Sequence, residues 1–245
     1  MRAPIQLGPV SALLEGEDRR AALLLASAPL LMTAYVYLGT RRFYLQHLRP
    51  HLVLLDDPQW TAGVWAYAAP VLFLALPAAL LLALALREPL VDGSFRDGWL
   101  GLGDWRSGWK AVAAMAPVMV LAGWWSSRLP EFRALHPFWS GAGRSGGAFL
   151  ENAALYLAYY VGFEVYFRGF LQFGLARRFG PWYALLVQTL ATTLVHVGLP
   201  PGEILGAIPA GIVWGIVAFR TGSIWPVILV HWILGVSLDA FIVLR

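Results

Sequence analysis

Seven long apolar stretches run through this chain, and they constrain its fold more than any other feature of the sequence. A membrane-spanning helix needs about 20 mainly apolar residues, because its backbone polar groups find no partner in hydrocarbon. The stretches cover about residues 21–39, 63–86, 109–125, 148–175, 182–197, 204–219 and 224–244. The sequence therefore predicts an all-α fold, a polytopic membrane bundle of about seven to eight transmembrane helices.

The composition agrees with a membrane protein and excludes several other classes. Hydrophobic residues make up 59% of the chain and charged residues only 13%, against about 25% charged residues in a soluble domain. The chain has no cysteine, which excludes disulfides, thiolate metal ligands and a cysteine nucleophile. The formal net charge is +4, and the basic residues are scattered rather than gathered in a polybasic tail. A nucleic-acid partner is therefore not expected.

The chain is predicted to form one membrane domain after a polar N-terminal segment. Residues 1–20 are polar and mixed in charge, and residues 21–245 form the predicted transmembrane domain. The connections between the last three apolar stretches are short, which makes those helices antiparallel neighbours. We divide the domain into scaffold helices, residues 21–146, and core helices, residues 147–245, which carry the unusual polar residues.

Four ionisable side chains lie within or at the end of the late apolar stretches: Glu164, Arg168, His196 and His231. Such groups cost several kcal/mol in hydrocarbon, so they are expected to meet in one polar site. Glu164 and Arg168 are four residues apart, which places them on one helical face. They could form a structural ion pair. Alternatively, the arginine could hold the carboxylate ionised and oriented to take a proton from water.

Metal binding by both histidines and Glu164 is conceivable, since two His and one carboxylate can hold zinc. The chain lacks the HExxH spacing, and we predict no metal. Asp239 follows His231 by about two helical turns. It could be a partner of His231, but we favour an end-of-helix carboxylate near the membrane interface.

Three other polar side chains in the apolar stretches have simpler interpretations. Gln188 is expected to form hydrogen bonds between helices. Thr192 and Thr193 are expected to bond back to carbonyl groups of their own helix.

Three short blocks of the late stretches resemble the CAAX protease and bacteriocin-processing family of glutamate-dependent intramembrane proteases. Residues 164–169, Glu-Val-Tyr-Phe-Arg-Gly, match the family's Glu-Glu-x-x-x-Arg block from its second glutamate onward. Residues 192–196 fall where the family has Phe-x-x-x-His, and residues 231–235 where it has His-x-x-x-Asn. The order of the blocks and their placement on three late apolar stretches also agree.

Three positions depart from the family pattern. Phe163 replaces the first glutamate, which is usually taken as the general base; Thr192 replaces the phenylalanine of the second block; Gly235 replaces the asparagine of the third. Either Glu164 acts as the base in this branch, or the site no longer hydrolyses anything. In the second case the protein would be a membrane scaffold that binds peptides. A small proton-linked transporter is a third possibility, because intramembrane Glu, Arg and His also form proton relays.

The resemblance implies an intramembrane endopeptidase without a cofactor. Glu164, helped by His196, would deprotonate a water molecule, His231 would donate a hydrogen bond to the oxyanion, and Arg168 would hold Glu164 or the substrate backbone. The implied partners are membrane lipids and a protein or peptide substrate with a membrane-anchored or lipidated C-terminal segment. A sorting-signal protease is the subtype that we predict by analogy, in a multi-pass protein of the bacterial inner membrane.

Overall fold

The computed structural model describes residues 16–51, 57–86 and 99–245, and these residues form an all-helical bundle. Most of the polar segment 1–20 lies outside the described residues. The elements, in chain order, are α1 (Gly16–Leu38), α2 (Arg41–Phe43), η2 (Tyr44–Leu48), α3 (Pro58–Pro70), η3 (Val71–Ala75), α4 (Leu76–Leu86), α5 (Trp105–Ser126), α6 (Pro130–Leu135), η5 (Ser140–Gly143), α7 (Gly146–Glu164), η6 (Val165–Phe173), α8 (Gly174–Leu194), α9 (Pro201–Thr221) and α10 (Trp225–Val243).

Local sequence signals explain where several helices begin and end. Asp57 caps α3 by accepting hydrogen bonds from two backbone N–H groups of its first turn, and Asp104 caps α5 by accepting one, from Ser107. Gly180 has φ +78°, a conformation that breaks α8 just before Pro181. The predicted fifth apolar stretch starts directly after this break, at residue 182.

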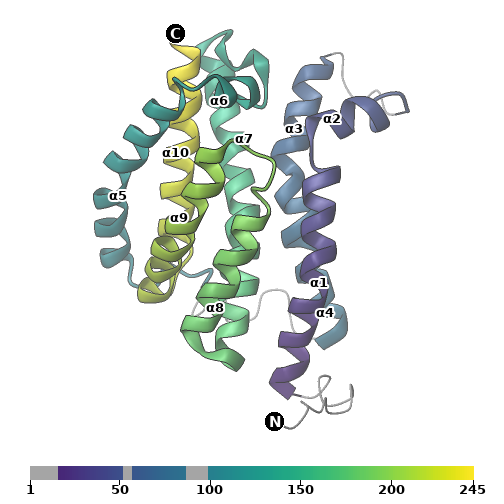
Figure 1. The fold of residues 1–245 in the computed structure, drawn as a ribbon, viewed down its shortest axis with the longest axis vertical. Helices are drawn as coiled ribbons and strands as arrows, with labels where there is room; N and C mark the ends of the chain where they lie inside the picture. The colour runs from purple at the N-terminus through teal and green to yellow at the C-terminus, as the bar shows by residue number, and fades with distance from the viewer. Residues whose placement is uncertain (1–15, 52–56, 87–98) are drawn as a thin grey trace, which may run out of the picture.

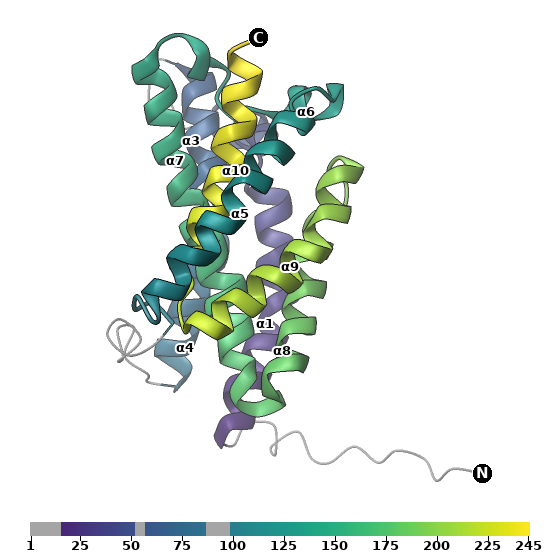
Figure 2. The same ribbon diagram turned by 90° about the vertical axis from the view of Figure 1, so that its left-hand side faces the viewer.

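The helices pack side by side, with α7, η6 and α8 in the middle of the molecule (Figure 1). On one side of this centre lie α5, α10 and α9, and α5 packs along α10. On the other side lie α1, α3 and α4. Figure 2 shows α9 running at a slant across the bundle, in contact with α8, α10 and α5. The helices that carry the candidate residues are therefore neighbours in space.

Each of the seven predicted stretches is helical, which confirms the predicted fold class. Within the described part of the chain, four helices are long and apolar enough to cross a membrane: Arg19–Leu38, Pro58–Ala85, Pro201–Thr221 and Trp225–Val243. The other three stretches include charged or amide side chains, such as Lys110, Glu164 and Gln188. The molecule is an integral membrane protein, and the count of seven to eight spanning helices stays a prediction.

Candidate active site

Glu164 and Arg168 form a buried ion pair where α7 passes into η6. The side chain of Glu164 is 0% exposed and that of Arg168 is 1% exposed. One guanidinium nitrogen, Nη1 of Arg168, lies 3.1 Å from Oε1 and 3.0 Å from Oε2 of Glu164. The segment that follows Glu164 is π-helical, a geometry that often marks functional sites. Because the two charges neutralise each other, this helix carries little net charge at a buried position.

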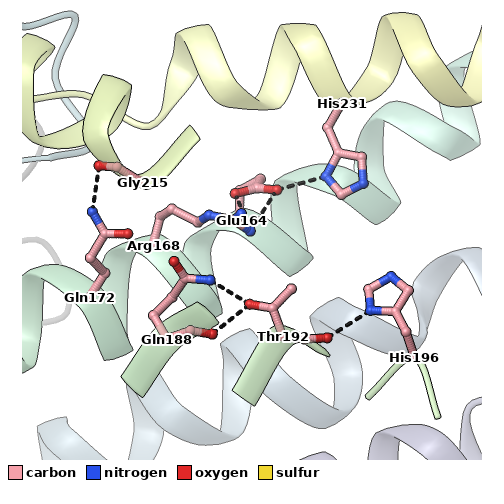
Figure 3. A network of polar contacts seen from close by, with 8 residues as sticks. All are labelled: Glu164, Arg168, Gln172, Gln188, Thr192, His196, Gly215 and His231. Atoms are coloured by element: carbon pink, nitrogen blue, oxygen red, sulfur yellow. Dashed lines mark hydrogen bonds and ion pairs between the residues drawn. The ribbon is translucent and has the colours of Figure 1, made fainter. Parts of the chain in front are cut away.

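His231 completes a second contact with the same carboxylate. Its Nδ1 lies 2.7 Å from Oε1 of Glu164 (Figure 3). A carboxylate oxygen accepts a hydrogen bond, so Nδ1 carries the proton and Nε2 of the neutral ring has a free lone pair. The ring packs against Tyr160 and Trp214, with centroid distances of 4.0 Å and 4.6 Å. His231 is thus held in one tautomer and one orientation.

His196 lies near the Glu164–Arg168 ion pair but does not contact it directly (Figure 3). Its Nδ1 is 2.7 Å from the carbonyl oxygen of Thr192, one turn earlier, and must donate to it. The ring of Phe163 is close to both imidazoles, with centroid distances of 6.2 Å to His196 and 5.6 Å to His231. A benzyl group is therefore a neighbour of both rings.

One cavity of about 800 Å³ connects these residues. Its wall contains both imidazoles, Arg168, Phe163 and a group of aromatic side chains: Tyr35, Phe138, Tyr156, Tyr159, Tyr160 and Trp214. Glu164, with no exposed surface, lies behind His231 rather than in the wall. The cavity therefore presents imidazole groups, and not the carboxylate, to its contents.

A second polar cluster, which we call the His136 cluster, lies on the same cavity. Nε2 of His136 is 3.4 Å from Glu203 at the start of α9, and Nδ1 is 3.6 Å from Asp239 on α10. Asp239 also accepts a hydrogen bond of 2.8 Å from Asn152 on α7, and the Tyr156 hydroxyl is 3.4 Å from Nδ1 of His136. The cluster joins the segment after α6 to three helices.

Asp239 lies near the end of α10, as predicted, but it is buried within the protein, and its place relative to the membrane interface stays a prediction. Its side chain is 0% exposed, and its partners are Asn152 and His136 rather than His231. A buried carboxylate needs a countercharge and hydrogen bonds, and His136 provides the countercharge from a segment about 100 residues earlier in the chain. Sequence spacing could not show this contact.

The stability of the protein is expected to depend on pH through His136. Burial by itself lowers the pKa of this ring, but hydrogen bonds and charge from Asp239 and Glu203 outweigh burial and raise the pKa from 6.5 to about 9. A group whose pKa is higher in the folded than in the unfolded protein stabilises the fold fully below its unfolded-state pKa. This contribution to the free energy of unfolding is lost as the pH rises through the folded-state pKa. This group should therefore contribute roughly 3 kcal/mol below pH 6.5, lost between about pH 6.5 and pH 9.

Unfolding midpoints measured from pH 6 to pH 9.5 test this expectation. The wild-type protein should lose stability across this range more steeply than the His136→Gln variant. The groups that face His136 are Glu203 on α9, Asp239 on α10 and Tyr156 on α7. Parallel pH profiles for the two proteins would contradict the assignment.

Three of the four predicted site residues meet through direct contacts, namely Glu164, Arg168 and His231, and His196 shares their cavity. Thr192 and Thr193 bond back to carbonyls of their own helix, as predicted. Gln188 donates to Thr192 within α8, which is not the predicted bond between helices. Among residues 16–51, 57–86 and 99–245, no group of three His, Cys, Asp or Glu side chains is arranged to hold a metal ion.

Sequence reasoning missed Tyr160, His136 and Glu203, all of which line the cavity. Glu203 follows a Pro-Pro turn and His136 precedes a proline, so the sequence indicates only that both lie in connections between helices. Tyr160 is one turn before Glu164, and this spacing is the one signal that could have drawn attention to it.

The fold and the site define an integral membrane protein with an oriented carboxylate–imidazole pair on an internal cavity. The family model of the type II CAAX prenyl endopeptidase, Rce1-like, matches residues 146–236, which contain all four predicted site residues. This match confirms, for this part of the chain, the resemblance to a family of proteases that the three blocks indicated. No curated protein and no solved structure matches the chain.

Proposed function

We propose that the protein is an intramembrane endopeptidase of the bacterial inner membrane. Its substrate would be a protein or peptide whose C-terminal segment is lipidated or anchored in the membrane, as in CAAX-type or sorting tails. One observation supports this proposal above the others: Glu164 and His231 form an oriented pair whose imidazole lines a cavity that also contains His196. The match of residues 146–236 to the model of a protease family supports the same reaction class.

The geometry favours a division of roles that differs from the one implied by the resemblance. Because Glu164 is behind His231, we assign it to orienting the ring and stabilising its protonated form. Nε2 of His231 would take a proton from a water molecule, and the resulting hydroxide would attack the scissile carbonyl carbon. As the tetrahedral intermediate collapses, the C–N bond breaks and His231 returns the proton to the leaving amine. Arg168 would keep Glu164 ionised, since the two are paired.

His196 would act on the other side of the bound peptide. Its Nδ1–H is held by the Thr192 carbonyl, so Nε2 of the neutral ring is an acceptor. In this position it would accept a hydrogen bond from the attacking water or from a peptide N–H group. The aromatic wall would bind the apolar part of the substrate, as apolar pockets with a few polar groups do.

One observation favours a second candidate, a binding protein that does not cut. The benzyl group of Phe163 neighbours both imidazoles, at the position where the family pattern has a glutamate carboxylate. Such a protein would bind a membrane-anchored peptide in the same cavity and release it intact. In such a protein, Glu164→Gln would leave the affinity for the peptide unchanged.

A cleavage assay in proteoliposomes separates the two candidates. The probe is a farnesylated, fluorescence-quenched peptide with a CAAX ending, next to the same peptide without the lipid. The wild-type protein should cleave the lipidated probe, and His231→Ala and His196→Ala should lower kcat by at least about 100-fold, the usual size of an acid–base contribution.

The matched control is His51→Ala, which replaces an exposed histidine outside the cavity. It should retain wild-type activity. Equal cleavage by the wild-type protein and both site variants would refute the protease assignment, and saturable binding of the probe without turnover would support the binding protein instead.

A further inference from the structure

The imidazoles of the site have no N–H group to offer to a developing oxyanion in their neutral forms. The Nδ1–H of His196 donates to the carbonyl of Thr192, and the Nδ1–H of His231 donates to Glu164. Both acceptors are oxygens without a proton, so both ring tautomers are decided. Peptide hydrolysis places negative charge on the carbonyl oxygen, and a donor held at that place lowers the barrier by a few kcal/mol. A donor that is in place before His231 takes up a proton has to come from another group in the cavity.

Tyr160 is placed to provide this hydrogen bond. It lies one turn before Glu164 on α7, its ring is 5% exposed, and it forms part of the cavity wall. Its ring centroid is 4.0 Å from that of His231. The base holds the attacking water, so the carbonyl oxygen of the attacked peptide would lie close to it. A hydroxyl group beside the base is therefore near that oxygen.

The absence of a side chain at Gly235 leaves room for the Tyr160 hydroxyl. Gly235 is one turn after His231 on α10, and a Cβ atom there would overlap the hydroxyl oxygen of Tyr160. The same Cβ would lie 2.7 Å from the Tyr156 ring. The hydroxyl therefore lies against the backbone of α10, on the helical face that carries His231.

Neighbouring rings hold Tyr160 in this position. Tyr156 stacks on it with a centroid distance of 4.7 Å and an interplanar angle of 18°, and Tyr159 packs edge-on at 5.2 Å. With the ring fixed, only rotation of the O–H bond remains to be ordered. A donor that is already positioned costs little reorganisation during the reaction.

The other tyrosine hydroxyls of the cavity wall have partners elsewhere. The hydroxyl groups of Tyr35 and Tyr159 are 2.5 Å apart and bond to each other, and that of Tyr156 lies against His136. The guanidinium of Arg168 is bonded to Glu164 and 1% exposed. We propose that the Tyr160 hydroxyl, in the space left by Gly235, donates the hydrogen bond that stabilises the oxyanion. This inference rests on the proposed protease function.

The test compares kcat and KM for Tyr160→Phe, using the farnesylated quenched peptide and the full-length protein in proteoliposomes. The ring stays and the hydroxyl is lost, so kcat should fall by about 100-fold, the usual effect of removing one oxyanion donor, while KM changes less than about twofold. The matched control is Tyr183→Phe, which removes the hydroxyl of an exposed tyrosine outside the cavity and should retain kcat within about threefold. A structural role of Tyr160 would instead change KM and the unfolding midpoint.

A second variant keeps the test independent of folding in Tyr160→Phe. Gly235→Ala retains the hydroxyl but displaces it, so its kcat should also fall. A wild-type kcat in either variant would overturn the inference while leaving the protease function intact. An inactive wild-type protein would instead sink the proposed function, and this inference with it.

Discussion

Replacing Glu164 by glutamine is expected to lower kcat by about 10³–10⁴-fold, the effect seen when the carboxylate behind a catalytic histidine loses its charge. Glu164 accepts the Nδ1–H of His231 at 2.7 Å and so selects the tautomer with a free Nε2. A glutamine amide can present its NH₂ group instead, which would favour the opposite tautomer. It also removes the negative charge that stabilises the protonated ring during the reaction.

The kinetic pattern distinguishes this role from substrate binding. Because Glu164 is 0% exposed and behind His231, KM should change less than about threefold. The matched control is Glu131→Gln, an exposed glutamate on α6, which should retain wild-type kcat and KM. An increase in KM at unchanged kcat would place Glu164 in substrate binding and contradict the assigned role.

Replacing Arg168 by leucine is expected to destabilise the protein by about 3–5 kcal/mol, because it leaves the carboxylate of Glu164 buried without its countercharge. The guanidinium lies 3.0 Å and 3.1 Å from the two carboxylate oxygens and is itself 1% exposed. Burial prevents water from compensating for the loss. The unfolding midpoint in detergent should fall by on the order of 10 °C.

The matched control is an exposed ion pair between an arginine and a carboxylate. Arg144 lies 3.2 Å from Asp57, but their side chains are 65% and 38% exposed. Water and salt screen this pair, so Arg144→Leu should leave the midpoint unchanged. Equal effects of the two substitutions would show that burial of the Glu164–Arg168 pair does not determine its contribution.

The double variant Glu164→Gln with Arg168→Gln separates stability from activity. Removing both charges leaves no uncompensated ion, so much of the stability lost in Arg168→Leu should be regained. The carboxylate behind His231 is still absent, so activity should not return. Recovery of activity together with stability would mean that the pair has only a structural role.

The contacts of Glu164 could be predicted from the sequence in part, whereas those of Asp239 could not. The Glu164–Arg168 contact was predicted from spacing, because residues four apart share a helical face whatever surrounds them. The meeting of Glu164 with His231 was expected only in outline, from the cost of ionisable groups in hydrocarbon. Asp239 shows the limit: its position in the sequence did not indicate a partner, and only the packing of the segment after α6 places His136 beside it.

Phe163 and Gly235 show the same limit at the site itself. In the sequence they read as two losses from the family pattern. In the structure, Phe163 is close to both imidazoles, and Gly235 leaves the space in which the Tyr160 hydroxyl lies. Gly235 and Tyr160 are more than 70 positions apart in the sequence, so their contact depends on how α7 and α10 pack.

The sequence by itself determined the helical class, the placement of the long helices and the pairing of Glu164 with Arg168. These features follow from local periodicity, apolar length and i, i+4 geometry, which neighbouring residues dictate. Only the tertiary structure decided that the carboxylate is behind His231 rather than in the cavity wall, and that His136 bridges two carboxylates. Those contacts depend on the relative rotation and approach of helices, which side-chain packing sets and no local pattern records.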